Sequence, residues 1–318
     1  MIGERISLGT LRAALELAGR APSADNSQPW SWRFGGRTLQ LDADRARELP
    51  ARDPEGRDMV LSCGAVLHHV RVVLAAIGVT AVVHRLPDPT RPDHLAALEL
   101  YSRHSPSADL GLAGAIKVRR TDHRRFTAWP VPEGFERDLV LRAADQGAAL
   151  RPVVDADVRA RLVAAIRAAA RLPERVSQAA EEVPANMSAD RGGPGGPTMR
   201  RTGTGTLAPS AVRGEDDSED GARLYALGTA ADSALWRLRA GEAASAVLLH
   251  ATELGLATSP LSRPLEISGT RVLVRDEVLG GALCPQLLLR IGWAPTGCAP
   301  PPPTARRPVD EVLTYLPN

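Results

Sequence analysis

The chain is poor in residues that build covalent or metal-bound frameworks. Its 318 residues include three cysteines, Cys63, Cys284 and Cys298, which lie far apart and form no C-x-x-C pair. This argues against a disulfide framework or a zinc site and predicts a reducing compartment. The adjacent histidines His68 and His69 point about 100° apart on a helix, so they cannot share a metal ion as an i, i+4 pair would.

Long apolar segments are also lacking. The longest apolar stretch covers residues 72–83, which is too short to span a bilayer. Charged residues, among them Glu4, Arg5 and Arg12, occupy the N-terminal segment, where a secretion signal would need an apolar core. The sequence therefore predicts a cytoplasmic protein with no membrane partner.

Neither sign of charge dominates the chain. Lys117 is the only lysine, yet 39 basic residues face 37 acidic ones and give a formal net charge of +2. The arginines are spread along the chain, so we expect no nucleic-acid-binding surface. What the chain does have is a hydrophobic content of 44%, which is enough for a buried core in one large domain or two fused units.

The most informative segment is residues 21–30, Ala-Pro-Ser-Ala-Asp-Asn-Ser-Gln-Pro-Trp. Pro22 ends a helix predicted over residues 10–19, and an alternating strand is predicted from Trp30 onward. Between them, a polar turn presents hydroxyl, amide and backbone N–H groups that suit the polar edge of a flat heterocycle. Without its Q-P-W extension, the same segment also fits an ordinary helix-to-strand loop.

The pattern P-S-x-x-N-x-Q-P-W resembles the flavin-edge loop of the nitroreductase superfamily, whose members are FMN-dependent NAD(P)H oxidoreductases. The resemblance implies an α+β fold with central antiparallel sheets flanked by helices. Trp30 fits either a core position or a position beside the flavin ring. The residues of this loop that would bind the cofactor are Pro22, Ser23, Asn26, Gln28 and Trp30.

A basic cluster follows residue 115. Four arginines and a threonine lie within residues 119–125, a set that suits a phosphate dianion, although a solvated basic turn fits as well. The cluster resembles the R-x-S-x-R-x-F opening of a nitroreductase protomer, with Thr for Ser and one extra residue before Phe126. The implied phosphate and ring-edge residues are Arg119, Arg120 and Thr121, with His123 or Arg124 near the pyrimidine edge.

Two later segments extend the resemblance. Ser259-Pro260-Leu261 follows a predicted buried helix, where the superfamily places backbone N–H groups against flavin N5 and O4. The acidic residue common there in nitroreductases is missing, and Leu261 or Ser262 stands in its place. Arg306 and Arg307 resemble the basic pair that completes the phosphate site. We identify no candidate proton donor in the sequence.

The chain also repeats itself. Residues 64–78 and 241–255 share a spacing, which predicts two buried helices, each opened by one glycine and closed by another. Residues 41–49 resemble residues 154–162, and each segment reads as a strand end, a turn and a helix start. Both similarities could arise by chance in an Ala/Leu/Arg-rich chain, but together they predict a duplicated α+β unit. Its halves would be residues 1–114 and 115–318.

This duplication fits the family resemblance. Nitroreductases are domain-swapped homodimers whose flavin sites take residues from both protomers. Here the first half has the flavin-edge loop, and the second has the phosphate and N5 segments. The resemblance therefore implies a pseudo-dimer within one chain, with one FMN and one dead site, as in the Acg-type branch. Residues 171–222 are predicted to form a lid, and the Pro-rich residues 298–308 an extended segment.

The implied activity is hydride transfer from NADH or NADPH through FMN N5 to a quinone or nitroaromatic acceptor. No side chain is assigned a catalytic role, because the flavin carries out the chemistry. One alternative is a flavin-storage protein that holds FMN under the lid with little or no reductase activity, and another is a scaffold without flavin. We expect small-molecule partners only, and a monomer, since the chain forms its own pseudo-dimer.

Overall fold

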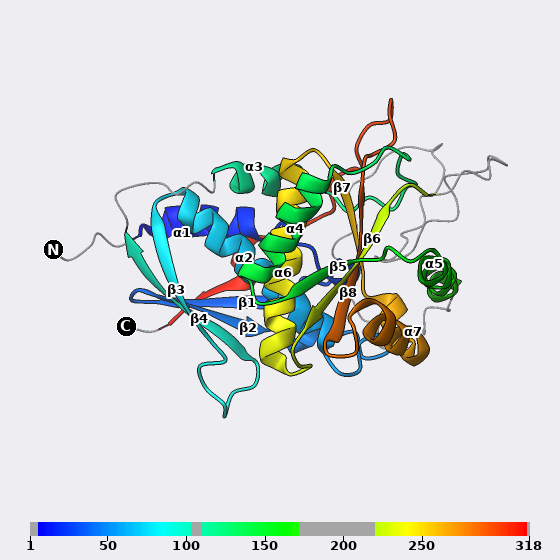
Figure 1. Ribbon diagram of the computed structural model, residues 1–318. Coiled ribbons are helices and arrows are strands. Elements are labelled where there is room, and N and C mark those ends of the chain that lie inside the picture. Colours follow the sequence, from blue (N-terminus) through cyan, green and yellow to red (C-terminus); the bar gives the residue numbers. More distant parts are fainter. Residues whose placement is uncertain (1–5, 103–109, 172–219, 317–318) are drawn as a thin grey trace, which may run out of the picture.

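The structure is a computed structural model that describes residues 6–102, 110–171 and 220–316 (Figure 1). Two sheets, antiparallel apart from one edge strand, lie on either side of a central pair of long helices, α2 and α6. This is the α+β architecture that the sequence predicts. Most of the lid predicted over 171–222 lies outside the described residues.

The first sheet has the strand order β3-β4-β2-β1-β9. Strands β1 to β4 pair antiparallel, whereas β9 pairs parallel with β1, Trp32 lying opposite Leu313. The chain thus returns to its first sheet after completing the second. The strands are β1 (Trp30–Gly35), β2 (Thr38–Ala43), β3 (Val79–Arg85), β4 (His94–Ser102) and β9 (Leu313–Tyr315).

The second sheet has the order β5-β6-β8-β7 and is antiparallel throughout. Its strands are β5 (Ala149–Pro152), β6 (Arg223–Thr229), β7 (Ala257–Leu261) and β8 (Cys284–Gly292). The long helices are α1 (Leu8–Ala18), α2 (Arg57–Ala76), α3 (Leu110–Val118), α4 (Glu133–Asp145), α5 (Ala156–Arg171) and α6 (Ala234–Glu253). Shorter helical segments are η1 (Ala24–Asn26), η2 (Arg45–Arg47), η5 (Arg263–Glu266), α7 (Ser268–Leu273), η6 (Val274–Val278) and α8 (Val309–Val312). Residues 293–308 contain no regular element, which agrees with the Pro-rich sequence.

The two sheets follow the same connection order. Apart from β9, the first reads β3-β4-β2-β1 and the second β7-β8-β6-β5. Helix α2 connects β2 to β3, and α6 connects β6 to β7 in the same way. The similarity between residues 41–49 and 154–162 does not follow this order, because the former ends β2 and the latter follows β5. That second similarity is therefore not evidence for duplication.

The two glycines predicted to open the central helices lie inside them instead. Gly64 and Gly241 are each seven residues past the first residue of their helix (57 to 64, 234 to 241). A Cβ on Gly64 would lie 2.1 Å from the carbonyl oxygen of Leu238, and one on Gly241 would lie 2.0 Å from that of Leu61. The glycines therefore let the two backbones cross in direct contact, a role that only a residue without a Cβ can fill.

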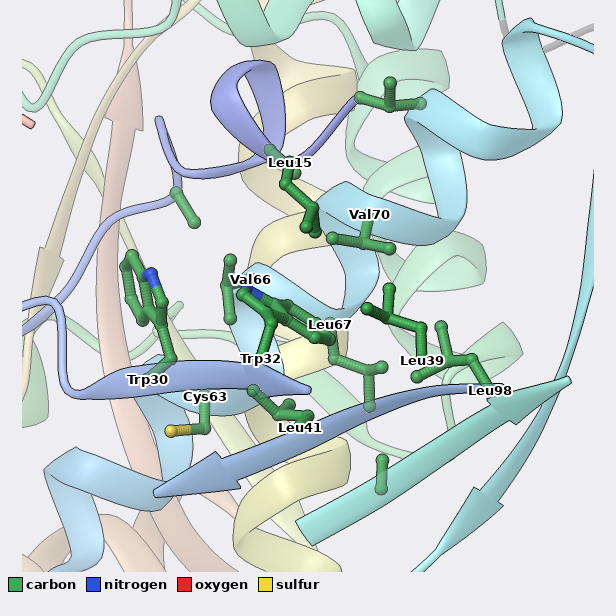
Figure 2. Packing of buried hydrophobic residues seen from close by; sticks show 14 of the residues in the cluster. Leu15, Trp30, Trp32, Leu39, Leu41, Cys63, Val66, Leu67, Val70 and Leu98 are labelled. Atoms are coloured by element: carbon green, nitrogen blue, oxygen red, sulfur yellow. The ribbon is translucent and has the colours of Figure 1, made fainter. Parts of the chain in front are cut away.

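Helix α2 is long and apolar enough to cross a membrane by length and composition alone, but 83% of its apolar stretch is buried inside the structure. It behaves as a core helix. Figure 2 shows Cys63, Val66 and Leu67 of this helix packed against Trp30 and Trp32 of β1. Trp30 is 1% exposed, so it takes the core position rather than a position beside a ligand.

Candidate functional site

A cavity of about 570 Å³, here called the larger cavity, has walls from distant parts of the chain. They comprise the loop 22–28, one face each of α2 and α6, residues 119–123, the end of β7 and a tail over 301–306. This volume lies within the usual range for small-molecule sites. Nine of the fifteen predicted cofactor residues line it: Pro22, Ser23, Asn26, Arg119, Arg120, Thr121, His123, Pro260 and Arg306.

Five arginines line this cavity. Arg52 pairs with Asp25, and the other four form what we call the arginine cluster: Arg20, Arg119, Arg120 and Arg306. Burial, followed by repulsion from Arg306 and Arg120, lowers the pKa of Arg119 to about 9. Burial, followed by repulsion from Arg20 and Arg120, lowers the pKa of Arg306 to about 10. Among the described residues, no carboxylate forms an ion pair with any of the four. The cluster is thus a concentration of positive charge without a counter-charge.

Arg119, which is buried, and Arg306, which is half-buried, each have one N–H donor, Nε, without a described partner. Arg119 is 5% exposed, and its Nη1 donates a long hydrogen bond of 3.4 Å to Thr121 Oγ1 while its Nε has no described partner. Arg306 Nη1 donates to Asn26 Oδ1 at 2.8 Å, and its Nε is also without a described partner. A buried guanidinium is costly unless an anion pairs with it. Charge and free donors together fit a phosphate dianion, which takes such bonds from arginine.

The loop 22–28 has a strained backbone. Asp25, Asn26 and Gln28 have φ values of 49°, 55° and 49°, in the left-handed region that residues with a Cβ seldom adopt. Ser23 Oγ accepts a hydrogen bond from the Gln28 backbone at 3.0 Å, and Ala24 N donates to a serine on α2. Such strain is concentrated at functional sites, where surrounding contacts maintain it. The sequence predicts the turn but not this conformation.

The amides of this loop hold the tail of the chain. Asn26 Nδ2 donates to the carbonyl oxygen of Ala305 at 3.0 Å. Gln28 Oε1 accepts from the backbone N–H of Arg307 at 2.8 Å, and this glutamine does not line the larger cavity. The two amides therefore place Arg306 in the wall, rather than both presenting their polar atoms to a ligand as the sequence predicts.

Five other predicted residues also lie outside the cavity wall. Trp30 belongs to the core, and Ser259 and Leu261 are fully buried within or beside the second sheet. Arg307 pairs with Asp44 at 3.1 Å.

Arg124 donates to both carboxylate oxygens of Asp122, at 2.9 and 2.6 Å, and is therefore neutralised by the protein itself. Of the two candidates for the ring edge, His123 lines the cavity and Arg124 does not. The segment 119–123 is held beside β7, where Asp122 N donates to Thr258 O at 2.9 Å. His123 Nδ1 lies 3.1 Å from Ser259 Oγ, and burial lowers the pKa of this histidine, so the neutral ring is favoured.

Among the wall residues that the sequence does not single out, three are charged: Arg20, Arg52 and Asp58. Asp58 is 9% exposed, and its Oδ2 accepts a hydrogen bond from the Oγ of Ser262, one of the two positions at which the resemblance implies an acidic residue. An acidic side chain is therefore present, but α2 supplies it. The sequence predicts that this helix begins at Gly64, so it does not place Asp58 on the helix. The helix begins at Arg57 instead, and Asp58 lies in its first turn.

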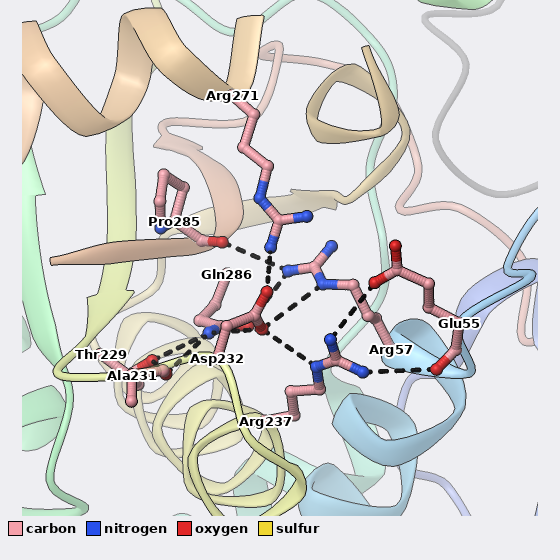
Figure 3. A network of polar contacts seen from close by, with 9 residues as sticks. All are labelled: Glu55, Arg57, Thr229, Ala231, Asp232, Arg237, Arg271, Pro285 and Gln286. Atoms are coloured by element: carbon pink, nitrogen blue, oxygen red, sulfur yellow. Dashed lines mark hydrogen bonds and ion pairs between the residues drawn. The ribbon is translucent and has the colours of Figure 1, made fainter. Parts of the chain in front are cut away.

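The start of α2 is anchored to the second sheet by buried charges (Figure 3). Arg57 Nη2 donates to the carbonyl oxygen of Pro285 at 3.2 Å and to Gln286 Oε1 at 3.1 Å. Asp232 lies 3.6 Å from Arg57 Nε and also pairs with Arg237 at 2.9 Å and Arg271 at 2.6 Å. These contacts fix the residue next to Asp58 and thereby its position in the wall.

A second cavity of about 290 Å³, here called the smaller cavity, lies between α2, α6, β3 and the turn at 145–146. Beside it, Glu242 is fully buried and accepts hydrogen bonds from Arg71 at 2.8 Å and from Arg85 at 2.7 and 2.8 Å. Arg71 also donates to Gln146 Oε1 at 2.9 Å. In the repeated connection order, β3 corresponds to β7. Since β3 lines the smaller cavity and the end of β7 lines the larger one, the two cavities occupy corresponding places.

Comparison with known proteins gives one consistent result. No family model matches the chain. A Mycobacterium tuberculosis protein named "Putative NAD(P)H nitroreductase" is 43% identical over 96% of this chain and 91% of its own. Another from that organism, "Putative NAD(P)H nitroreductase acg", is 34% identical over 97% and 96%. A crystal structure titled "putative nitroreductase", from Anabaena variabilis, has the same fold, with a TM-score of 0.55 at 10% identity over 92% and 90% of the chains. The chain therefore belongs to the nitroreductase superfamily, in the group that contains the mycobacterial Acg protein.

Proposed function

We propose that the chain binds FMN in the larger cavity and catalyses the NAD(P)H-dependent reduction of a quinone or nitroaromatic compound. The observation that carries this proposal is the arginine cluster, whose four cations have no carboxylate partner among the described residues. A ligand with a phosphate dianion supplies the missing charge. FMN carries such a group, and family membership makes it the ligand of choice.

The proposed roles of the side chains follow from their positions. Arg119, Arg306 and the Thr121 hydroxyl bind the phosphate with charge-assisted hydrogen bonds. The small residues Ala65 and Ala244, on the facing helices α2 and α6, line the cavity, and the flat ring would lie against them. When bound there, FMN supplies the hydride chemistry, and the protein contributes binding, orientation and electrostatics.

We further propose that one chain binds one FMN and acts as its own pseudo-dimer, without a second copy. The repeated strand order supports this duplication. The smaller cavity has half the volume of the larger one, and the buried Glu242 pairs with two arginines beside it. The three cysteines are free, in support of a reducing and hence cytoplasmic compartment.

The decisive experiment is an anaerobic visible spectrum of the protein reconstituted with FMN, before and after NADH or NADPH. Bleaching of the flavin band within seconds is the expected result. A yellow protein that dithionite reduces and NAD(P)H does not would overturn the reductase proposal in favour of flavin storage. A protein that binds no FMN would overturn both.

The chain offers a matched pair of variants for the binding step. Arg306→Gln removes a cation from the cavity wall, whereas Arg307→Gln removes its neighbour, which pairs with Asp44 outside the wall. We expect FMN affinity to fall at least tenfold in the first variant and less than threefold in the second, because one charge-assisted bond contributes about 1.5–3 kcal/mol. Fluorescence titration of FMN measures both.

A further inference from the structure

Asp58 is the only acidic side chain that lines the larger cavity among the described residues. None of the arginine cluster is among the charges that act most strongly on it. The larger cavity therefore has a cationic part and, apart from it, a single carboxyl group. The charged or titratable groups that face this carboxyl from the neighbouring elements are Arg52, Asp53, Arg57 and Glu266.

The carboxyl group is held in one orientation. Ser262 Oγ donates to its Oδ2, whereas its Oδ1 accepts no hydrogen bond from the described residues. The backbone is fixed as well, because Ser62 Oγ donates to the Asp58 carbonyl oxygen at 2.6 Å and Arg57 binds the second sheet. One carboxylate oxygen is thus anchored and the other is available to a ligand.

We propose that Asp58 donates a proton to the acceptor that is reduced in the larger cavity. The proposal rests on the proposed reductase function and assigns it a catalytic residue. Reduction of a quinone to a hydroquinone takes two electrons and two protons. NAD(P)H supplies, by way of the cofactor, a hydride that carries both electrons and the first hydrogen. Asp58 supplies the second hydrogen as a proton to the other quinone oxygen, becomes a carboxylate and regains a proton from solvent.

The surroundings of Asp58 suit this role. Burial raises its pKa, while the hydrogen bond from Ser262 opposes that shift. Repulsion from Asp53 raises the pKa further, whereas Arg57 and Arg52 lower it. A general acid works best when its pKa lies near the working pH, so a raised carboxyl pKa favours proton donation.

The test compares how fast the reduced protein is reoxidised by an acceptor that takes up protons and by one that takes up electrons alone. Protein loaded with FMN is reduced with dithionite and mixed rapidly with menadione, which needs protons, or with ferricyanide, which takes electrons alone. In Asp58→Asn we expect reoxidation by menadione to slow at least tenfold and reoxidation by ferricyanide to stay within twofold. Glu266→Gln, which changes a neighbouring carboxyl outside the cavity wall, serves as the control and should leave both rates within twofold.

Dithionite supplies the electrons here, so the result does not depend on reduction by NAD(P)H. Failure of NAD(P)H to bleach the flavin would overturn the reductase proposal. The reoxidation rates with menadione and with ferricyanide could still be compared in that case. Equal slowing with both acceptors, or with neither, would overturn the role of Asp58. Asp58→Glu should restore menadione reoxidation if an acid is what the site needs.

A second measurement needs neither FMN nor turnover. The infrared carbonyl band of a protonated carboxylic acid is compared at pH 6 and pH 7 in the FMN-free protein and in Asp58→Asn. We expect a band in the wild type that the variant lacks. A carboxyl group already ionised at both pH values would overturn the proposal, even if the variant bound no flavin.

Discussion

The two cavities are built from corresponding elements, yet they differ in whether their arginines have carboxylate partners. Around the larger one, four arginines have no carboxylate partner among the described residues. Beside the smaller one, Arg71 and Arg85 both bind Glu242, which is fully buried. A protein leaves buried cations unpaired where a ligand supplies the anion, and pairs them internally where none does. The contrast supports the proposal that the larger cavity binds a ligand and the smaller one does not.

A single position accounts for much of this difference. Ala65 and Glu242 each directly follow the glycine at which their helix crosses its partner. The alanine lines the larger cavity and leaves it open. The glutamate joins three segments of the chain through its two arginines. At corresponding positions, Ala65 thus leaves the larger cavity open, whereas Glu242 forms an ion cluster beside the smaller cavity.

The largest effect is expected from breaking the ion cluster with Arg85→Met. This change leaves a fully buried carboxylate with one partner, which costs about 3 kcal/mol of unfolding free energy or more. Arg33→Met is the matched control, because Arg33 forms the same two-pronged pair with Asp42 in a half-buried setting, and there we expect about 1 kcal/mol or less. Urea unfolding measures both, and equal losses would remove the distinction.

The next prediction concerns the larger cavity, where one substitution should weaken FMN binding but stabilise the FMN-free protein. Arg119→Gln should weaken FMN binding by about 1.5–3 kcal/mol, since it removes a charge-assisted bond to phosphate. In the FMN-free protein the same change should raise the melting temperature, because a buried and repelled cation disappears. Calorimetry with and without FMN checks both. A destabilised FMN-free variant would mean that the arginine is a structural residue.

The helix crossing that shapes both cavities can be tested with Gly64→Ala. The added methyl group would meet the carbonyl oxygen of Leu238, so we expect a loss of about 2 kcal/mol in unfolding free energy. Gly114→Ala on α3, where a Cβ meets no heavy atom within 4 Å, should be neutral or stabilising by up to about 1 kcal/mol. Equal melting temperatures for the two variants would contradict the direct backbone contact.

The smallest effect is a pH dependence at the smaller cavity. Burial, followed by Arg71 and Arg142, lowers the pKa of His68 to about 3, against about 6.5 in an unfolded chain. The neutral form is therefore favoured on folding, and this stability is present above pH 6.5 and lost as the pH falls below it. At pH 5.5 the loss is about 1.4 kcal/mol.

His68→Asn should make the stability profile less steep between pH 7 and 5.5, as measured by urea unfolding, and the buried His69 should account for part of the slope that remains. His84→Asn, on β3, is the control and should keep the slope of the wild type. A His68→Asn profile as steep as that of the wild type would show that the buried ring does not carry the effect.

The parts of the site that the sequence predicts share one property. Asn26, Arg119 and Arg306 belong to motifs in which residue types recur at fixed spacing, so their placement needs no knowledge of the packing. The turn at residues 22–28 and the strands beside it are predictable for the same reason, since Pro and an alternating pattern mark their limits.

The remaining parts depend on contacts between distant segments. Asp58 meets Ser262 only because α2 lies against the second sheet. The sequence does not distinguish Arg307 from Arg306, but only Arg307 pairs with a carboxylate, that of Asp44, which is distant in the sequence. The inner position of Gly64 also becomes visible only when the partner helix is in place. Each is a tertiary property that no local pattern encodes.

The parallel strand β9 has a consequence for biosynthesis. It completes the first sheet 278 residues after β1 ends (35 to 313), so every other strand leaves the ribosome before it. Until then, the edge of β1 stays open to pairing with another nascent chain. The tail that carries Arg306 is synthesised just before β9, and the larger cavity is therefore completed only after these residues have left the ribosome. FMN capture should thus wait for the synthesis of residue 306, and a premature stop before that residue should yield a protein that cannot retain the cofactor.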